Sequence, residues 1–287
     1  MKYIRELGRI LFVAGLLIIF GVFTRPDNSA PVFSTPPVSE LPAEINIHPA
    51  AQPGIPRSVR VPVLMYHHIG EMPSNPDRYR RDLTVSTADF EAEVKFLYAA
   101  GYSCISTQAL YQYQQGEVDL AKKPCVIIFD DGFDDAFKNA IPTLLKYRMT
   151  GSFAVITQYV ANSEYASWPT ILGAQTVGME IVSHSQHHID FTSRKYSHQD
   201  KINEIQGSLK DIQAHLHTAP ITFVYPYGHH DLETEAIVAG SGFKMAFTTA
   251  PGFYGENKNA YEMPRVRVHG VEGIDRFAES LGITLHK

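Results

Sequence analysis

Two short stretches of the chain carry side chains that bind metals or move protons. The first holds adjacent carboxylates, Asp130 and Asp131, directly after an apolar run. Neighbouring carboxylates beside a buried strand are costly unless a metal or another cation compensates them. The second holds two imidazoles, His184 and His188, four positions apart. If one helical turn follows the preceding strand, both imidazoles face the same way and converge on one ion.

Each of these patterns taken alone is also typical of a solvated turn or of surface histidines. Together, two imidazoles and one carboxylate at strand ends on a common rim predict a metal site with open positions for water and substrate. His187 points elsewhere at this spacing, so we expect it to be exposed or to contact the ligands rather than the ion.

The elements that must position these residues alternate between strands and helices from residue 60 onward. Apolar, β-prone runs predict strands at 61–66, 102–106, 124–129, 152–156, 180–183, 222–225, 245–248 and 266–268. Helical spacing predicts helices at 87–100, 107–115, 136–148, 169–178, 198–216, 232–240 and 274–281, the first capped by Thr87. This alternation predicts an α/β fold, a (β/α) barrel of about seven parallel strands, closed or partly open. Chemistry in such folds belongs at the carboxyl ends of the strands.

The front of the chain differs from the rest. Lys2, Arg5 and Arg9 precede an apolar run at 10–23, which predicts that residues 1–25 are an export signal or a membrane anchor, cleaved or uncleaved. Residues 26–57 are rich in proline and without a sustained apolar period, so we expect a linker. Residues 58–287 remain for one folded catalytic domain, on the periplasmic or extracellular side.

Composition excludes several classes of protein. Hydrophobic residues make up 44% and charged residues 19%, which argues against wholesale disorder and against a protein with many membrane spans. The net charge of −5 leaves no basic surface for nucleic acid. Cys104 and Cys125 lie in neighbouring predicted strands, where a disulfide is conceivable after export, but buried free thiols are the favoured expectation.

Three motifs in order carry a resemblance to a known family. They read Val-Ile-Ile-Phe-Asp-Asp-Gly, then His-Ser-x-x-His, then Tyr225-Pro226-Tyr227-Gly228. The chain thereby resembles the polysaccharide deacetylase (NodB-homology) family, carbohydrate esterase family four, over about residues 61–281. Pro-Val-Leu-Met-Tyr-His-His-Ile near the start of the domain and Met-Pro-Arg-Val-Arg-Val at 263–268 are similar to the branch that deacetylates poly-N-acetylglucosamine of biofilm matrices.

The resemblance implies roles for the residues of the first two motifs. It implies a divalent metal, most commonly zinc, held by Asp131, His184 and His188. Asp130 is then the general base. This is physically consistent, because a metal polarises the poorly electrophilic acetamide carbonyl and makes water more acidic. A 2+ charge also allows both adjacent carboxylates to stay ionised.

The third motif is expected to bind substrate. The family takes a backbone N–H for the developing oxyanion from this loop, here at Tyr227, and Tyr225 and Pro226 are assigned with it. Tyr225 and Trp168 are also candidates to face sugar rings, although most such aromatic residues pack in a core.

The general acid is expected from one of three histidines. Many relatives use a histidine in a C-terminal Leu-x-His motif, which here would correspond to His286 near the end of the chain. The biofilm branch takes it from the end of the first strand, where His67 is favoured and His68 is the alternative. Alternation along a strand sends those two side chains to opposite sides.

One position departs from the family pattern. Many relatives have an arginine, paired with the base, where this chain has Val224. Arg265 or Arg267 must then supply the cation from a later strand. Both lie on the same face by spacing, and the resemblance favours Arg265.

The expected activity is N-deacetylation of an exported N-acetylglucosamine polymer, with poly-N-acetylglucosamine favoured. Peptidoglycan and chitin are alternative substrates. A catalytically silent carbohydrate-binding domain is the alternative from a different class of function, and the complete set of acidic residues and histidines argues against it. The expected partners are the polysaccharide and, through the N-terminal segment, a membrane.

Overall fold

The computed structural model of the chain describes residues 31, 33, 60–120, 123–255, 259–270 and 272–284. The predicted export segment at 1–25, nearly all of the linker and His286 lie outside the described residues. Among the helices of the described part, none has the length and apolar character needed to cross a membrane.

A closed ring of seven parallel strands forms the centre of the domain, as predicted. The ring closes because β1 pairs with β10 on one side and with β5 on the other. The short β4 (Ser103–Cys104) pairs with the beginning of β5. The strands of the ring are β1 (Val63–Tyr66), β5 (Pro124–Phe129), β6 (Ser152–Val155), β7 (Glu180–Ser183), β8 (Thr222–Val224), β9 (Met245–Pro251) and β10 (Met263–Arg267).

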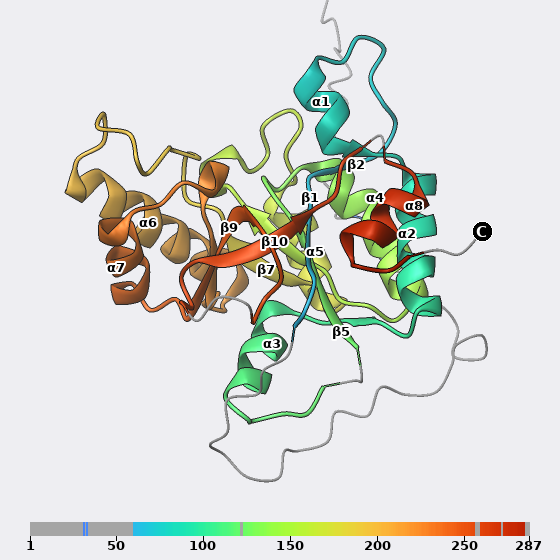
Figure 1. The fold of residues 1–287 in the computed structure, drawn as a ribbon. Helices are drawn as coiled ribbons and strands as arrows, with labels where there is room; N and C mark the ends of the chain where they lie inside the picture. Colours follow the sequence, from blue (N-terminus) through green and yellow to red (C-terminus); the bar gives the residue numbers. More distant parts are fainter. Residues whose placement is uncertain are drawn as a thin grey trace, which may run out of the picture.

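Helices surround this ring close to where their spacing predicts them. They are α2 (Thr87–Ala99), α3 (Thr107–Gln114), α4 (Asp134–Lys146), α5 (Trp168–Thr176), α6 (His198–Leu216), α7 (Leu232–Gly240) and α8 (Ile274–Ser280). Figure 1 shows α6 and α7 on one side of the strands and α2, α4 and α8 on the other. The cap of α2 is Ser86, whose hydroxyl accepts from the backbone N–H of Asp89, so the prediction of Thr87 as the cap was wrong by one residue.

Burial on both faces of β5 explains its unbroken apolar run. Ile127 and Phe129 pack outward against the helices, in a cluster that includes Phe137 and Phe153. Val126 and Ile128 belong to a second cluster with other strand residues. Parallel strands covered on both sides require such continuous hydrophobicity. The loop after β5 therefore starts from a rigid strand.

A small element beside the barrel was not predicted. The short strands β2 (His68–Ile69) and β3 (Thr84–Val85) pair in parallel, and the connection between them contains α1 (Arg78–Leu83). Figure 1 shows α1 and β2 at one end of the barrel and α3 at the other. Strands of two residues are too short to show alternation in a sequence.

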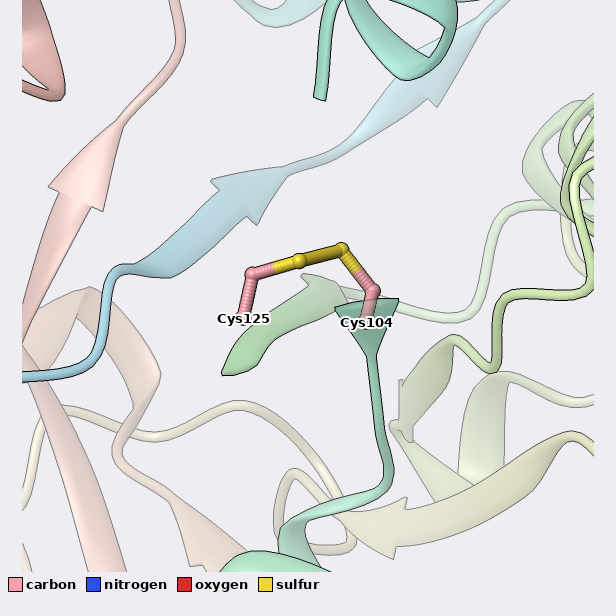
Figure 2. The surroundings of a disulfide bond; sticks show 2 residues. All are labelled: Cys104 and Cys125. Carbon is pink, nitrogen blue, oxygen red and sulfur yellow. A yellow bond between two sulfur atoms is a disulfide. The ribbon is translucent and has the colours of Figure 1, made fainter. Parts of the chain in front are cut away.

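Cys104 and Cys125 form a disulfide, so the expectation of free thiols was wrong. The bond joins β4 to the start of β5, and Figure 2 shows it bridging the two strands. The two residues are direct partners in the β4–β5 register, with Cα atoms 4.3 Å apart. That register brings the thiols together, and the sequence alone does not reveal it.

Candidate active site

The functional side chains come from loops at the carboxyl ends of different strands. Asp130 and Asp131 follow β5, and the backbone N–H of Asp130 donates to the carbonyl of Tyr66 at the end of β1. His184 follows β7, and its N–H donates to the carbonyl of Val155 at the end of β6. Neighbouring strands thus fix both loops on one rim of the barrel.

Asp131, His184 and His188 form a compact group that could hold a metal ion. Oδ1 of Asp131 lies 3.3 Å from Nε2 of His184 and 3.4 Å from Nε2 of His188. Bonds of about 2.0–2.1 Å in a tetrahedral zinc site place donor atoms about 3.3 Å apart. The structure therefore brings together the three predicted ligands at a spacing that fits a divalent metal.

The backbone fixes which nitrogen of His184 faces the group. Nδ1 of His184 lies 2.7 Å from the carbonyl oxygen of Val224, which can only accept, so Nδ1 carries the hydrogen. The lone pair of Nε2 is then free for a metal. Burial and the neighbouring His184 lower the pKa of His188 to about 4, which keeps that imidazole in the neutral form that binds metals. The carbonyl of Val224 was not foreseen as an orienting group.

The loops that carry these ligands, and the turn of the third motif, hold strained backbone. Asp131, Ser185, His188 and Tyr227 have φ angles of 72°, 65°, 55° and 59°. Left-handed backbone is unfavourable for residues with a Cβ and gathers at functional sites. At Ser185, the hydroxyl accepts from the backbone N–H of His188, which helps to hold the turn between the two imidazoles.

Asp130 is paired with Arg265 at the centre of the site. Nη1 and Nη2 of Arg265 donate to the two carboxylate oxygens at 2.7 and 2.8 Å, and Nε donates to the carbonyl of Thr248 at 2.8 Å. Burial raises the pKa of Asp130, but the charge and hydrogen bonds of Arg265 outweigh it and hold that pKa below its usual value. Asp130 is therefore an ionised carboxylate with a fixed orientation.

Arg267, the other candidate, points away from Asp130. Its guanidinium pairs with Asp82 in α1, and Asp82 also pairs with His269. Arg265, and not Arg267, is therefore the cation that pairs with Asp130 in this chain, which has a valine at position 224.

The two histidines after β1 diverge, as strand alternation predicts. Nε2 of His67 lies 4.0 Å from Oδ2 of Asp130, inside the site. His68 turns away, with Nδ1 2.9 Å from Oδ2 of Asp135 and its ring stacked on Phe133 at 3.7 Å. Burial lowers the pKa of His67 despite the nearby carboxylates. Of the two, only His67 can reach a substrate beside Asp130.

The third motif forms a tight turn against β9. Tyr227 is 55% exposed, and its ring centre lies 4.5 Å from that of His188. Gly228 has φ +75°, and a Cβ there would lie 2.2 Å from Oγ1 of Thr249, so no other residue fits. Tyr225 is fully buried and stacks on His230. Its ring thus packs in the core and cannot face a sugar as expected.

Other expected candidates lie away from the ligands. His187 is exposed and pairs with Glu204 through Nδ1 at 2.6 Å. Trp168 stacks on His215 at 4.0 Å, between α5 and α6, and thus does not offer its ring to a substrate at the barrel rim. A hollow of about 380 Å³ adjoins the site, with His188, Tyr227, Tyr196 and Asp190 among its lining residues.

Comparisons with known proteins place these features in a family. Residues 117–246 match the family model for polysaccharide deacetylase. A solved polysaccharide deacetylase from Bacillus cereus is 27% identical, with a TM-score of 0.68 over 78% of this chain and 69% of that chain. A Streptococcus pyogenes deacetylase is 24% identical and shares the fold, with a TM-score of 0.71 over 80% of this chain and 100% of that chain.

A curated relative has a more specific name. A poly-β-1,6-N-acetyl-D-glucosamine N-deacetylase from Staphylococcus aureus is 23% identical over 201 residues, which cover 66% of this chain and 69% of that protein. The closed seven-stranded barrel agrees with the fold of these neighbours. Residues 117–246 therefore form a polysaccharide deacetylase domain, and the protein is a hydrolase that acts on carbon–nitrogen bonds.

Proposed function

We propose that this protein is a metal-dependent enzyme that removes acetyl groups from N-acetylglucosamine units of an exported polysaccharide, with poly-N-acetylglucosamine as the favoured substrate. One observation carries the proposal. The group of Asp131, His184 and His188 lies directly beside Asp130, a buried carboxylate held in one orientation by Arg265. A domain that only binds sugars has no need for a buried base next to three metal ligands.

The donor set suits a divalent metal. One carboxylate oxygen and two imidazole nitrogens leave coordination positions open, as in catalytic zinc sites. A metal held there would polarise a carbonyl oxygen and make water more acidic. Cobalt, nickel, manganese or iron also accept such ligands, and zinc is the favoured ion.

The residues around these ligands divide the proton transfers between them. Asp130 accepts the proton from the water that adds to the acetamide carbonyl carbon. The backbone N–H of Tyr227 stabilises the negative charge that develops on the carbonyl oxygen. His67 donates a proton to the nitrogen as the carbon–nitrogen bond breaks. The products are acetate and a free amine, and return of the proton from Asp130 to His67, whose Nε2 lies 4.0 Å from Oδ2 of Asp130, restores the site.

Arg265 acts by positioning Asp130. Its two parallel hydrogen bonds prevent the carboxylate from rotating, and its charge keeps Asp130 ionised. The hydrogen bond from Nε to Thr248 fixes the guanidinium itself. The Asp130 carboxylate is thus ready to accept a proton without reorganisation.

Two observations support the substrate class. The Staphylococcus aureus relative is named for poly-β-1,6-N-acetyl-D-glucosamine. The hollow beside His188 offers an aromatic ring at Tyr196 and another at Tyr227, which suit contact with sugar rings. Deacetylation would give the polymer positive charges and so change its adhesion.

Export of the domain is part of the proposal. The basic and apolar residues at 1–25, outside the described part of the chain, have the pattern of a signal or membrane anchor. The disulfide between Cys104 and Cys125 supports this placement, because disulfides persist mainly in oxidising compartments outside the cytosol.

Release of amine from soluble poly-N-acetylglucosamine oligomers tests the proposal. The full chain should release amine, lose that activity with a chelator and regain it with zinc. Chitin and peptidoglycan fragments, assayed in parallel, define the substrate. Failure to release amine from any N-acetylated glycan in the presence of metal would contradict the proposed activity.

A further inference from the structure

A second group of possible ligands lies outside the candidate active site. His230 follows the Tyr-Pro-Tyr-Gly turn, Glu235 lies in α7, and Glu262 comes directly before β10. Nε2 of His230 is 3.5 Å from Oε1 of Glu235 and 3.4 Å from Oε1 of Glu262. These separations are close to the ~3.3 Å between donors of a tetrahedral site with bonds of about 2.0–2.1 Å.

The hydrogen bonds around this group orient Nε2 of His230 and Oε1 of Glu235, which lie close to each other and to Oε1 of Glu262. Nδ1 of His230 lies 3.2 Å from the carbonyl oxygen of Gly228, which can only accept, so the ring hydrogen lies on Nδ1. Nε2 then faces the two carboxylates. Asn259 donates to Oε2 of Glu235 at 2.9 Å, which leaves Oε1 directed at the histidine. A cation or a proton is required among these atoms.

A buried hydroxyl beside the group gives an independent indication of a ligand. Tyr225 is fully buried, and its ring stacks on that of His230 at 4.9 Å. Within the described residues, its hydroxyl finds no hydrogen-bond partner. A buried hydroxyl without a partner is costly.

We propose that His230, Glu235 and Glu262 form a second divalent-metal site and that the hydroxyl of Tyr225 faces the bound ion. One imidazole nitrogen and two carboxylate oxygens suit zinc or a similar transition metal. The side chains are mostly covered, with 20%, 11% and 38% of their surfaces exposed.

The ion would have a structural role. It would join three segments: the end of the Tyr-Pro-Tyr-Gly turn, α7, and the loop that leads into β10. Two of these segments lead directly to the candidate active site, through Tyr227 and through Arg265. The second site therefore holds the frame on which the first is built, without touching the substrate.

The number of zinc ions bound by the full chain tests this site. Metal-free protein is titrated with zinc and the bound ions are counted by mass spectrometry of the metal after dialysis. We expect two ions per chain for the wild type and one for Glu235→Gln. Glu233→Gln is the matched control, since Glu233 lies in the same helix but pairs with Lys201, and it should keep two ions. A single ion in the wild type, unchanged in Glu235→Gln, would overturn the proposal and assign the bridging role to a proton.

A double variant separates the second site from the proposed activity. His184→Ala with His188→Ala removes two ligands of the candidate active site but none of the second. Zinc should still bind once to this variant and raise its thermal unfolding temperature, and adding Glu235→Gln should abolish both effects. Circular dichroism confirms that each variant is folded. If the folded double variant binds no zinc, the second site is refuted. That result would leave the proposal for the candidate active site unchanged.

Discussion

Two groups of histidine and carboxylate ligands in this molecule share their spacing but differ in their surroundings. In the first, Oδ1 of Asp131 lies 3.3 and 3.4 Å from two imidazole nitrogens, and in the second, Nε2 of His230 lies 3.4 and 3.5 Å from two carboxylate oxygens. The first has the proposed base, Asp130, and a hollow beside it. The second has a buried phenol. Ligand geometry alone therefore does not define a catalytic site, and the groups around the ligands decide what a metal could do there.

Substitution of the base should have the largest effect and should separate the two groups most clearly. Asp130→Asn keeps the size of the side chain but removes its ability to take a proton. We expect amine release to fall roughly 10³-fold, within the range for loss of a general base. Zinc content should stay at two ions per chain. Loss of an ion together with activity would show that Asp130 is a ligand instead.

Breaking the pair between Arg265 and Asp130 should act on stability as well as on rate. Arg265→Ala leaves a buried carboxylate without its cation, which typically costs about 3–5 kcal/mol. Chemical denaturation measures the free energy of unfolding. Arg265→Lys is the matched control, because it keeps the charge but cannot donate two parallel hydrogen bonds. We expect Lys to restore much of the stability but little of the activity, and equal recovery of both would contradict a positioning role.

The two adjacent histidines after β1 provide a matched pair of substitutions. His67→Ala should lower amine release roughly 100-fold, the lower end for loss of a general acid. His68→Ala should act mainly on stability, because His68 contacts Asp135 and Phe133 and points away from the site. Equal small losses of activity would redirect attention to His286.

The buried carboxylate of Glu93 shows the effect of burial where no cation among the described residues lowers the pKa. Burial raises its pKa to about 8, and its partner is the hydroxyl of Tyr66 at 2.9 Å. The pKa of Glu93 is higher in the folded protein than in the unfolded chain. The contribution of the protonated Glu93 to the free energy of unfolding is therefore complete below about pH 4.5 and is lost as the pH rises towards 8.

Measured unfolding free energies should reveal this dependence. Between pH 5 and pH 7.5 we expect the wild type to lose about 3 kcal/mol more stability than Glu93→Gln, which cannot ionise. Identical pH profiles for the two proteins would show that Glu93 is already charged in the folded state. In that case burial would not raise the pKa of Glu93, and Glu93 would no longer contrast with Asp130, whose pKa Arg265 keeps low.

Regular elements of the fold were predictable where the pattern was long. The helix α6 spans His198–Leu216, as the sequence indicates, because nineteen residues give several turns of apolar repeat. The unbroken apolar run of β5 likewise predicts burial on both faces. The paired β2 and β3 were missed because two residues carry no period. The disulfide was misjudged because it depends on the strand register between Cys104 and Cys125.

The grouping of the first set of ligands was predictable because strand ends of a parallel barrel meet on one rim. Asp131 and His184 each follow a strand, so topology brings them together. The second group has no such rule, since His230, Glu235 and Glu262 lie on a turn, a helix and a loop without regular spacing. The orientation of His184 depends on a backbone carbonyl, which any residue type provides, so sequence could not indicate it.

The closure of the barrel also determines when the site can form during synthesis. Strand β1 pairs with both β5 and β10, and Arg265 reaches Asp130 across 135 positions of sequence. Until β10 has left the ribosome, β1 and β9 keep unpaired edges that invite aggregation, and the buried carboxylate lacks its cation. Contacts between such distant residues also fold slowly. We therefore expect every chain truncated before β10 to be inactive and prone to aggregate, even though it retains Asp130 and all three ligands beside it.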